Sequence, residues 1–234
     1  KKSNNTQIFR MPLYMTRTAR RTSLRWDNKG PYREARREAL SLHSIEMEKS
    51  YLFGDEVDIA GFNGQRQTMT KGLFSWLSTN KGGKFKVDGL LDESTLDDLM
   101  EDIFRYGHNE KLGLCGSTFL RAITTLGKRN GIINMVPSDK VYGMKIVEYT
   151  TAFGTLYLRN HPLLSQHVDW RKDCFVVDVQ NLGRRTIDDT MFIKDRQARD
   201  EDASKDEFLE ESGMEVQFEE THGYIEGVEG ALIA

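Results

Sequence analysis

The chain has 234 residues, of which 38% are apolar and 29% are charged, and its mean hydropathy is −0.57. This composition is typical of a soluble chain long enough to bury a core, and the lack of any run of 18 apolar residues predicts no membrane span. No secretory leader is visible, and Cys115 and Cys174 are too few for a disulfide framework or a four-cysteine zinc site, so we expect reduced thiols inside a cell.

Charge is distributed unevenly. Residues 1–37 hold 11 Lys and Arg against two acidic residues, a balance of +9, whereas the remaining 197 residues hold 22 basic and 34 acidic groups, a balance of −12. The stretch 195–220 alone has 11 carboxylates and three basic residues. A basic segment and an acidic body attract each other between copies. Two separately solvated surfaces are the simpler interpretation, and phosphate binding by the basic segment is another.

The first predicted element is a strand over 7–18, where apolar and polar residues nearly alternate. Pro12 lacks a backbone donor, which favours an edge of the sheet. The strongest periodic pattern runs over 32–53 and predicts a long amphipathic helix, with Pro31 in its first turn and Gly54 at its end. The predicted core face of this helix consists of Ala35, Ala39, Leu42, Ile45 and Leu52.

We expect a loop over 55–69 and a short apolar element over 72–77. Asp92 or Ser94 caps a predicted helix that ends at Gly107, and Ser117 caps another over 118–129. The other expected elements are strands at 112–114, 144–150, 154–158 and 174–179, an exposed charged loop at 194–205, and a partly exposed strand at 215–220.

Catalytic motifs are absent from the sequence, which has no nucleotide-binding loop, zinc-protease motif or serine-hydrolase motif. His161, His167 and Asp169 indicate a metal site only weakly, because no second His or Cys cluster accompanies them. Cys115 precedes a predicted helix, where a thiolate is favoured, but a small buried residue is the simpler interpretation. The sequence therefore predicts no enzyme, no cofactor and no metal ion.

The basic strand carries apolar residues, including Leu13, Tyr14 and Trp26, that are costly to leave in water. Symmetric self-association would cover them. Six segments of the chain resemble segments of a major capsid protein family of tailed bacteriophages and occur in the same order. The need for a partner agrees with this resemblance. These segments are Thr6–Arg10, Thr16 with Thr18–Ala19, Glu46–Gly54, Lys71–Asn80, Glu148–Gly154 and Thr221–Gly227.

The resemblance implies an α+β chain with the Hong Kong 97-type capsid fold, built from an extended loop, a long spine helix, a peripheral domain and an axial domain. It implies an extended-loop or arm segment at 1–30, the spine helix and peripheral domain at 31–75, a mainly axial domain at 76–205, and a return strand of the peripheral domain at 206–234. Because the first residue is Lys1, we also expect an arm and an outgoing strand of the extended loop to precede it in a longer product.

The function implied by the resemblance is that of a structural virion protein. Copies would form hexamers and pentamers of an icosahedral head that encloses double-stranded DNA without reading its sequence, with portal, scaffold or decoration proteins as further partners. Assembly would take place in the host cytoplasm. A nucleic-acid-binding protein that uses the basic N-terminal segment is the alternative.

Charge complementarity supplies a hypothesis for the contact between subunits. We expect Arg17, Arg20, Arg21 and Arg25 of one subunit to engage carboxylates of an adjacent subunit. The candidate carboxylates are Asp200, Glu201, Glu207 and Glu211.

Overall fold

The computed structural model describes residues 3–22, 30–61, 63–79, 83–130, 137–141 and 144–232. The chain divides into two compact units. The first unit comprises residues 1–75 and 184–215, and the second comprises 76–183 and 216–234. The assignment to extended-loop, peripheral and axial domains, with boundaries at 30, 75 and 205, stays a prediction.

The helices are α1 (Arg17–Arg21), α2 (Pro31–Phe53), α3 (Leu73–Thr79), α4 (Glu93–Phe104), α5 (Ser117–Asn130) and α6 (Pro162–Gln166). The strands are β1 (Gln7–Thr16), β2 (Val57–Ala60), β3 (Arg66–Met69), β4 (Lys84–Leu91), β5 (Glu110–Cys115), β6 (Pro137–Val141), β7 (Met144–Thr150), β8 (Thr155–Asn160), β9 (Cys174–Val177), β10 (Leu182–Ile193), β11 (Ala203–Val216) and β12 (Gly223–Ala231). Short 3₁₀ turns lie at Trp170–Lys172 (η1), Val179–Asn181 (η2) and Glu219–Thr221 (η3).

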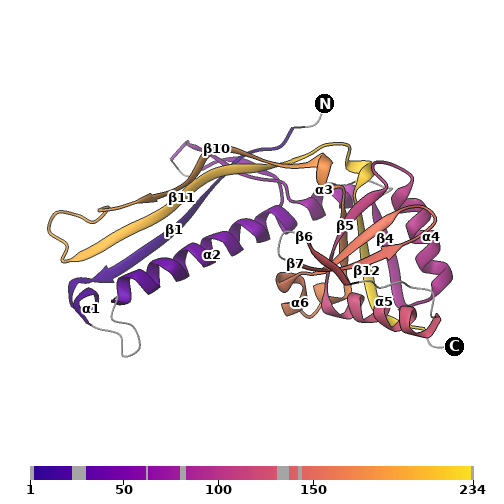
Figure 1. Cartoon of the computed structure of the whole chain (residues 1–234). Coiled ribbons are helices and arrows are strands. Elements are labelled where there is room, and N and C mark those ends of the chain that lie inside the picture. The colour runs from indigo at the N-terminus through magenta and orange to yellow at the C-terminus, as the bar shows by residue number, and fades with distance from the viewer. Residues whose placement is uncertain are drawn as a thin grey trace. The chain divides into compact units, whose positions relative to one another are not determined.

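The first unit is built from a three-stranded sheet and the long helix α2, which runs beside it (Figure 1). The strand order is β1-β11-β10, so the prediction that β1 occupies an edge is confirmed. β1 pairs antiparallel with β11 over its whole length, from Gln7 opposite Ser212 to Thr16 opposite Ala203. Since side chains alternate along a strand, one face of this sheet turns toward α2 and the other turns away.

The long helix forms over the predicted residues. Gly30 precedes it with φ of +84°, a conformation that favours glycine, and the Gly54 N–H donates to the Ser50 carbonyl at 2.8 Å to close its last turn. Its predicted core face is partly wrong, because Leu42 and Ile45 are 46% and 37% exposed. The buried residues are Ala39, His43, Met47 and Leu52.

The physical reason for this difference is that α2 has two apolar stripes. The sheet covers the stripe that contains His43, whose ring stacks on Phe208 of β11 with 6.2 Å between centroids. From the sequence, the stripe through Leu42 and Ile45 was predicted to face the core because it is the more apolar of the two. Histidine is less often buried than aliphatic residues, so the stripe that contains His43 was not predicted to be buried.

The expected loop over 55–69 is also partly wrong, because β2 and β3 form an antiparallel hairpin there. Arg66 pairs with Asp58 across this hairpin at 2.7 Å. Both strands have only four residues and are mostly exposed, and β3 is mainly polar, so the pattern is too short to predict strands from apolar alternation. The short apolar element that follows is the helix α3.

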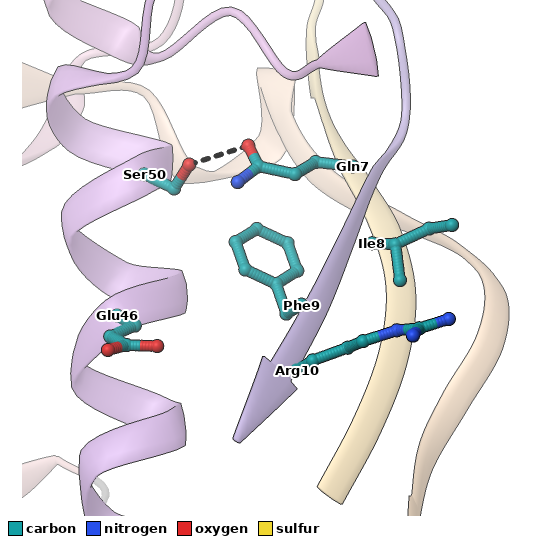
Figure 2. A pocket seen from close by; sticks show the side chains of 6 residues that line it. All are labelled: Gln7, Ile8, Phe9, Arg10, Glu46 and Ser50. Atoms are coloured by element: carbon teal, nitrogen blue, oxygen red, sulfur yellow. Dashed lines mark hydrogen bonds between the residues drawn. The ribbon is translucent and has the colours of Figure 1, made fainter. Parts of the chain in front are cut away.

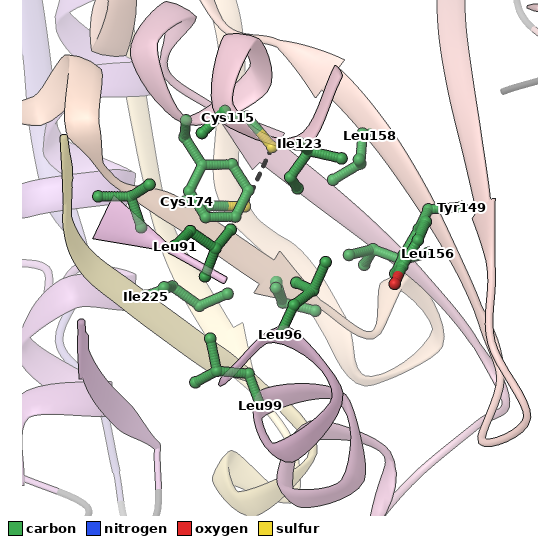
Figure 3. Packing of buried hydrophobic residues seen from close by; sticks show 14 of the residues in the cluster. Leu91, Leu96, Leu99, Cys115, Ile123, Tyr149, Leu156, Leu158, Cys174 and Ile225 are labelled. Carbon is green, nitrogen blue, oxygen red and sulfur yellow. Dashed lines mark hydrogen bonds between the residues drawn. The ribbon is translucent and has the colours of Figure 1, made fainter. Parts of the chain in front are cut away.

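The second unit contains a seven-stranded mixed sheet with the order β4-β12-β9-β5-β8-β7-β6. α4 and α5 contribute Leu96, Leu99, Phe119 and Ile123 to one core, which also takes Ile225 from the sheet (Figure 3). Both helices begin where predicted, and the Asp92 side chain accepts from the Thr95 N–H at 2.8 Å. The predicted strands at 112–114, 144–150, 154–158 and 174–179 correspond to β5, β7, β8 and β9.

Further strands were missed or misplaced by the sequence. β4, β6 and β10 were not predicted, and β11 runs from the end of the expected charged loop to the start of the expected last strand. The expected strand at 215–220 is wrong beyond Val216, since Phe218 has φ of +49° and the 3₁₀ turn η3 follows it. Buried and exposed residues alternate along β11, but charged residues occur on both faces, so hydropathy does not reveal this alternation.

Lys111 on β5 is a buried cation that joins three parts of the second unit. Only 1% of this residue is exposed, and its Nζ donates to the carbonyls of Ile103 (2.7 Å), Tyr106 (2.8 Å) and Thr221 (2.7 Å). Three donors meet three acceptors, so each ammonium hydrogen has a partner. Burial lowers the pKa of Lys111 to about 8.

Among the described residues, no helix combines the length and the apolar character needed to cross a membrane.

The buried stripe of α2 predicts different effects for two substitutions on the same helix. Met47 is 8% exposed, so Met47→Asp buries an unpaired carboxylate and should lower the free energy of unfolding by about 3 kcal/mol or more. Leu42→Asp places the same group in water and should cost about 1 kcal/mol or less. Urea unfolding followed by circular dichroism measures both, and equal losses would contradict the observed helix orientation.

Candidate assembly interface

β1 has two different faces within the first unit. Gln7 and Phe9 point toward α2, whereas Ile8 and Arg10 point away from it (Figure 2). The Ser50 hydroxyl donates to the Gln7 side chain at 2.8 Å, and the Phe9 ring meets Tyr51 edge-on with 5.9 Å between centroids. These contacts hold β1 against the helix. An open groove of about 520 Å³ follows this side of the strand and reaches Glu46.

Large apolar side chains remain exposed on several elements of the first unit, including β1, α2 and β10. On β1, Ile8 and Tyr14 are 52% and 55% exposed. The outer stripe of α2 adds Leu40, Leu42 and Ile45, and β10 adds Ile187 and Met191. Since single exposed apolar residues are ordinary, the significant feature is their recurrence within the unit that also contains the predicted interface charges.

The structure places three of the four predicted arginines in α1, at the end of β1. Arg17 lies 3.7 Å from Asp202 of its own chain, and both side chains are well exposed. Arg20 donates to the Ser204 hydroxyl at 3.0 Å, and its guanidinium lies 4.8 Å from the centroid of the Tyr32 ring. Arg21 is exposed, and within the described part of the chain it has no ion pair. Arg25 lies outside the described residues.

The predicted carboxylates lie on β11 and on the connection before it. Glu201 pairs with Lys205 at 2.8 Å, and Glu207 pairs with Arg196 at 3.1 Å. Glu211 accepts from the Thr6 hydroxyl at 2.9 Å. Asp200 is exposed, and it has no ion pair among the residues that the structure describes. The chain thus brings α1 next to the connection before β11, whereas Glu211, opposite Ile8, lies toward the other end of the sheet.

A second group of charges, which the sequence did not single out, lies on the inner face of β11. Glu210 is fully buried and accepts from the hydroxyls of Ser212 (2.6 Å) and Thr190 (2.5 Å). Tyr51 of α2 shares a hydrogen bond of 2.6 Å with Ser212, and Arg184 lies 3.5 Å from Glu210. This Glu210 cluster therefore joins β10, β11 and α2 through polar contacts.

Asp206, four residues before Glu210, makes a similar inward contact. Its carboxylate accepts from the Tyr32 hydroxyl of α2 and from the Asp195 N–H at 3.0 Å. Burial, together with this carboxylate, raises the pKa of Tyr32 to about 12. The sequence does contain a signal for this inner face. Alternate residues of a strand lie on the same face, and the four residues concerned are spaced two apart: Asp206, Phe208, Glu210 and Ser212.

Of the four buried residues of α2, only His43 has a titratable ring. This ring packs against Phe208 on the inner face of β11. Neither ring nitrogen has a hydrogen-bond partner among the described residues, and the residue is fully buried. Burial lowers the pKa of His43, while the nearby carboxylates of Glu210 and Glu46 act in the opposite direction. The neutral ring is therefore the favoured form in the folded chain.

The weak candidates for catalysis and metal binding contact one another only in pairs. The His161 N–H donates to the Cys115 carbonyl at 2.8 Å, and His167 lies 3.9 Å from Asp169. Cys115 is fully buried, whereas the His167 side chain is 47% exposed and its ring stacks on Trp170 at 4.1 Å. In the described ranges, no group of three or more His, Cys, Asp and Glu side chains is arranged to hold a metal ion.

A family model described as "SU10 major capsid protein" matches residues 1–229. The chain belongs to this family of major capsid proteins. It is also 26% identical, over 172 residues, to the major capsid protein of Pseudomonas phage PaMx41. That match covers 69% of this chain and 40% of the relative, so the chain spans less than half of the relative's length.

Solved structures resemble the chain over nearly all of its length. The holo-SrpI encapsulin complex of Synechococcus elongatus PCC 7942 gives a TM-score of 0.66 at 10% identity, over 99% of this chain and 77% of that one. The capsid of cyanophage A-1(L) gives 0.62 at 10% identity, over 95% and 77%. The satellite phage P4 procapsid gives 0.55 at 11% identity, over 99% and 73%. The Hong Kong 97-type capsid fold, with α2 as spine helix, is therefore confirmed.

The Glu210 cluster predicts that adjacent residues of β11 differ sharply in importance. Glu210→Met removes the acceptor of the buried Ser212 hydroxyl and of the Thr190 hydroxyl, and it should lower the free energy of unfolding by about 2–3 kcal/mol. Glu211→Met changes the outer face and should cost about 0.5 kcal/mol or less. Urea unfolding of both variants provides the measurement. A larger loss for Glu211→Met would show that the faces of β11 are assigned the wrong way round.

The lowered pKa of His43 predicts a loss of stability in acid. Because its folded pKa lies below the ordinary value of 6.5, the unfolded chain binds more protons between these two values, and the free energy of unfolding falls as pH drops through that window. His43→Leu should weaken this dependence between pH 7.5 and pH 5. Part of it should remain, because burial also lowers the pKa of His222 in the second unit. Urea midpoints across this range provide the check, and an unchanged pH profile in His43→Leu would exclude the effect.

Proposed function

We propose that the chain is the shell-forming subunit of an icosahedral phage head, in which copies form hexamers and pentamers around double-stranded DNA. The observation that carries this proposal is the match of a capsid family model over residues 1–229. The likeness to capsid and encapsulin structures supports it through the fold. The subunit is then a component of the virion that assembles in the host cytoplasm.

The surfaces of the first unit support assembly from many copies. β1 is an edge strand, so its backbone is paired with another strand on one side only, and its side chains Ile8 and Tyr14 are exposed. Both features favour association with another chain. The outer stripe of α2 offers Leu42 and Ile45 for the same purpose. Neighbouring copies in a closed shell would cover both surfaces.

The partners that follow are chiefly further copies of the chain. Portal, scaffold and decoration proteins complete a phage head, and packaged DNA would be held without recognition of its sequence. Metal ions and cofactors have no role in this proposal.

In this proposal, ion pairs that form between subunits, in place of pairs within one chain, determine how neighbouring subunits align. Arg17 and Asp202 are 60% and 76% exposed, and such a pair contributes about 0–1 kcal/mol. An adjacent subunit can therefore replace the partner within the chain at little cost. In the proposed arrangement Arg17, Arg20, Arg21 and Arg25 meet carboxylates of a neighbour. Asp200 and Glu201, together with the outer-face residues Glu207 and Glu211 of β11, supply those carboxylates.

Charge reversal in α1 tests this pairing. Arg20→Glu combined with Arg21→Glu should prevent closed particles while leaving the circular dichroism of the subunit unchanged, because both side chains are exposed. Negative-stain microscopy and light scattering of the full-length product measure assembly. Normal shells from this double variant would exclude the proposed pairing.

A matched control separates the position of the charges from their number. Arg105→Glu with Arg121→Glu makes the same change in net charge on exposed residues of the second unit, and it should impair assembly less. If both double variants fail alike, net charge rather than α1 governs assembly. A monomer that binds DNA with a steep dependence on salt would favour the nucleic-acid-binding alternative.

A further inference from the structure

The two cysteines of the chain meet in the core of the second unit. Cys115 ends β5 and Cys174 begins β9, 59 residues later, and the two strands are central neighbours in the seven-stranded sheet. Both residues are fully buried, and their sulfur atoms lie 3.1 Å apart (Figure 3). Their separation along the chain gives no sign of this contact, which only the pairing of β5 with β9 creates.

The backbone places the two cysteines where the Cα atoms of opposite residues come closest in an antiparallel sheet. Cys115 and Cys174 are direct partners across β5 and β9. The Gly116 N–H donates to the Asp173 carbonyl at 2.9 Å, so the hydrogen bond joins the residues that flank the pair. The cysteines therefore form a non-hydrogen-bonded pair, in which Cα atoms are about 4.5 Å apart. This separation lies within the range that disulfides span.

The surroundings leave room for the sulfur atoms to approach. Gly113 lies two residues before Cys115 on β5, and a Cβ at that position would stand 3.5 Å from both sulfurs and 2.9 Å from Leu158. Closing the contact from 3.1 Å to a bond of about 2.05 Å needs a movement of only about 1 Å. No charged side chain has to move for this bond to form.

We propose that Cys115 and Cys174 are a disulfide-forming pair, which closes within one chain when the folded protein meets a small peroxide. One sulfur attacks the peroxide O–O bond to give a sulfenic acid and water. The second sulfur then displaces the hydroxyl group of the sulfenic acid, which leaves as a second water. Two thiols and one peroxide thus give one disulfide and two waters. A peroxide is suited to this step because it is close to water in size and the thiols are buried.

Only the timing rests on the proposed function, because a virion leaves the reducing cytoplasm, whereas the pairing follows from the fold alone. The bond would tie together the ends of a segment of about 60 residues that includes α5, β7 and β8. Such a link restricts the unfolded chain, and we expect it to raise the Tm by about 10 °C.

Hydrogen peroxide treatment of the full chain under native conditions tests the pairing. After quenching, the protein is denatured, exposed to a maleimide and examined by intact-mass spectrometry and non-reducing gel electrophoresis. The expected product is a single chain that has lost the mass of two hydrogens, takes up no maleimide and has a raised Tm. Dithiothreitol should restore two reactive thiols and the original Tm.

Single variants and a refolding arm complete the design. Cys115→Ala and Cys174→Ala should keep one reactive thiol and show no shift in Tm with peroxide. The unfolded wild-type chain is also refolded in a glutathione redox buffer. A disulfide found only after refolding would support the pairing but overturn its formation in the folded chain. Two free thiols in both arms, or a bond between chains, would overturn the proposal. Because no arm measures particles, failure here is distinct from failure of the proposed function.

Discussion

The antiparallel pairing of β1 with β11 is the contact on which the first unit depends. These strands come from opposite ends of the sequence, and their register determines which side chains face α2. If β1 slipped by one residue against β11, Phe9 would turn into water and Ile8 would face the helix. The strong pattern of α2 is therefore necessary for the unit but not sufficient, because the helix becomes buried only when the two distant strands present one face.

The polar groups between helix and sheet give this packing its specificity. Apolar contacts alone tolerate small shifts of a helix along a sheet, whereas Glu210 and Asp206 need particular donors from Ser212, Thr190 and Tyr32. Burial of a carboxylate costs free energy, and correct hydrogen bonding offsets that cost only in one arrangement. We therefore regard the inner face of β11 as the element that selects one register, at some expense of stability.

The second unit is organised differently. Its core is mainly apolar, with α4 and α5 covering one face of a mixed sheet, and its buried cation Lys111 serves to satisfy three backbone carbonyls. The two thiols lie within this core and not at a surface. Exposed apolar side chains occur in both units, so the proposal that contacts between subunits use the first unit rests on the charges of α1 and β11.

The sequence by itself determined the spine helix, the edge position of β1, the cap of α4 and the capsid family, because these rest on local periodicity, on a capping residue, on Pro12 and on ordered short segments. It also identified which charges to examine. Only the tertiary structure decided that Leu42 stays exposed while His43 is buried, that Glu210 points inward and Glu211 outward, and that Cys115 meets Cys174. Each of these outcomes depends on which distant strand lies opposite, and a local pattern carries no information about partners that lie many residues away along the chain.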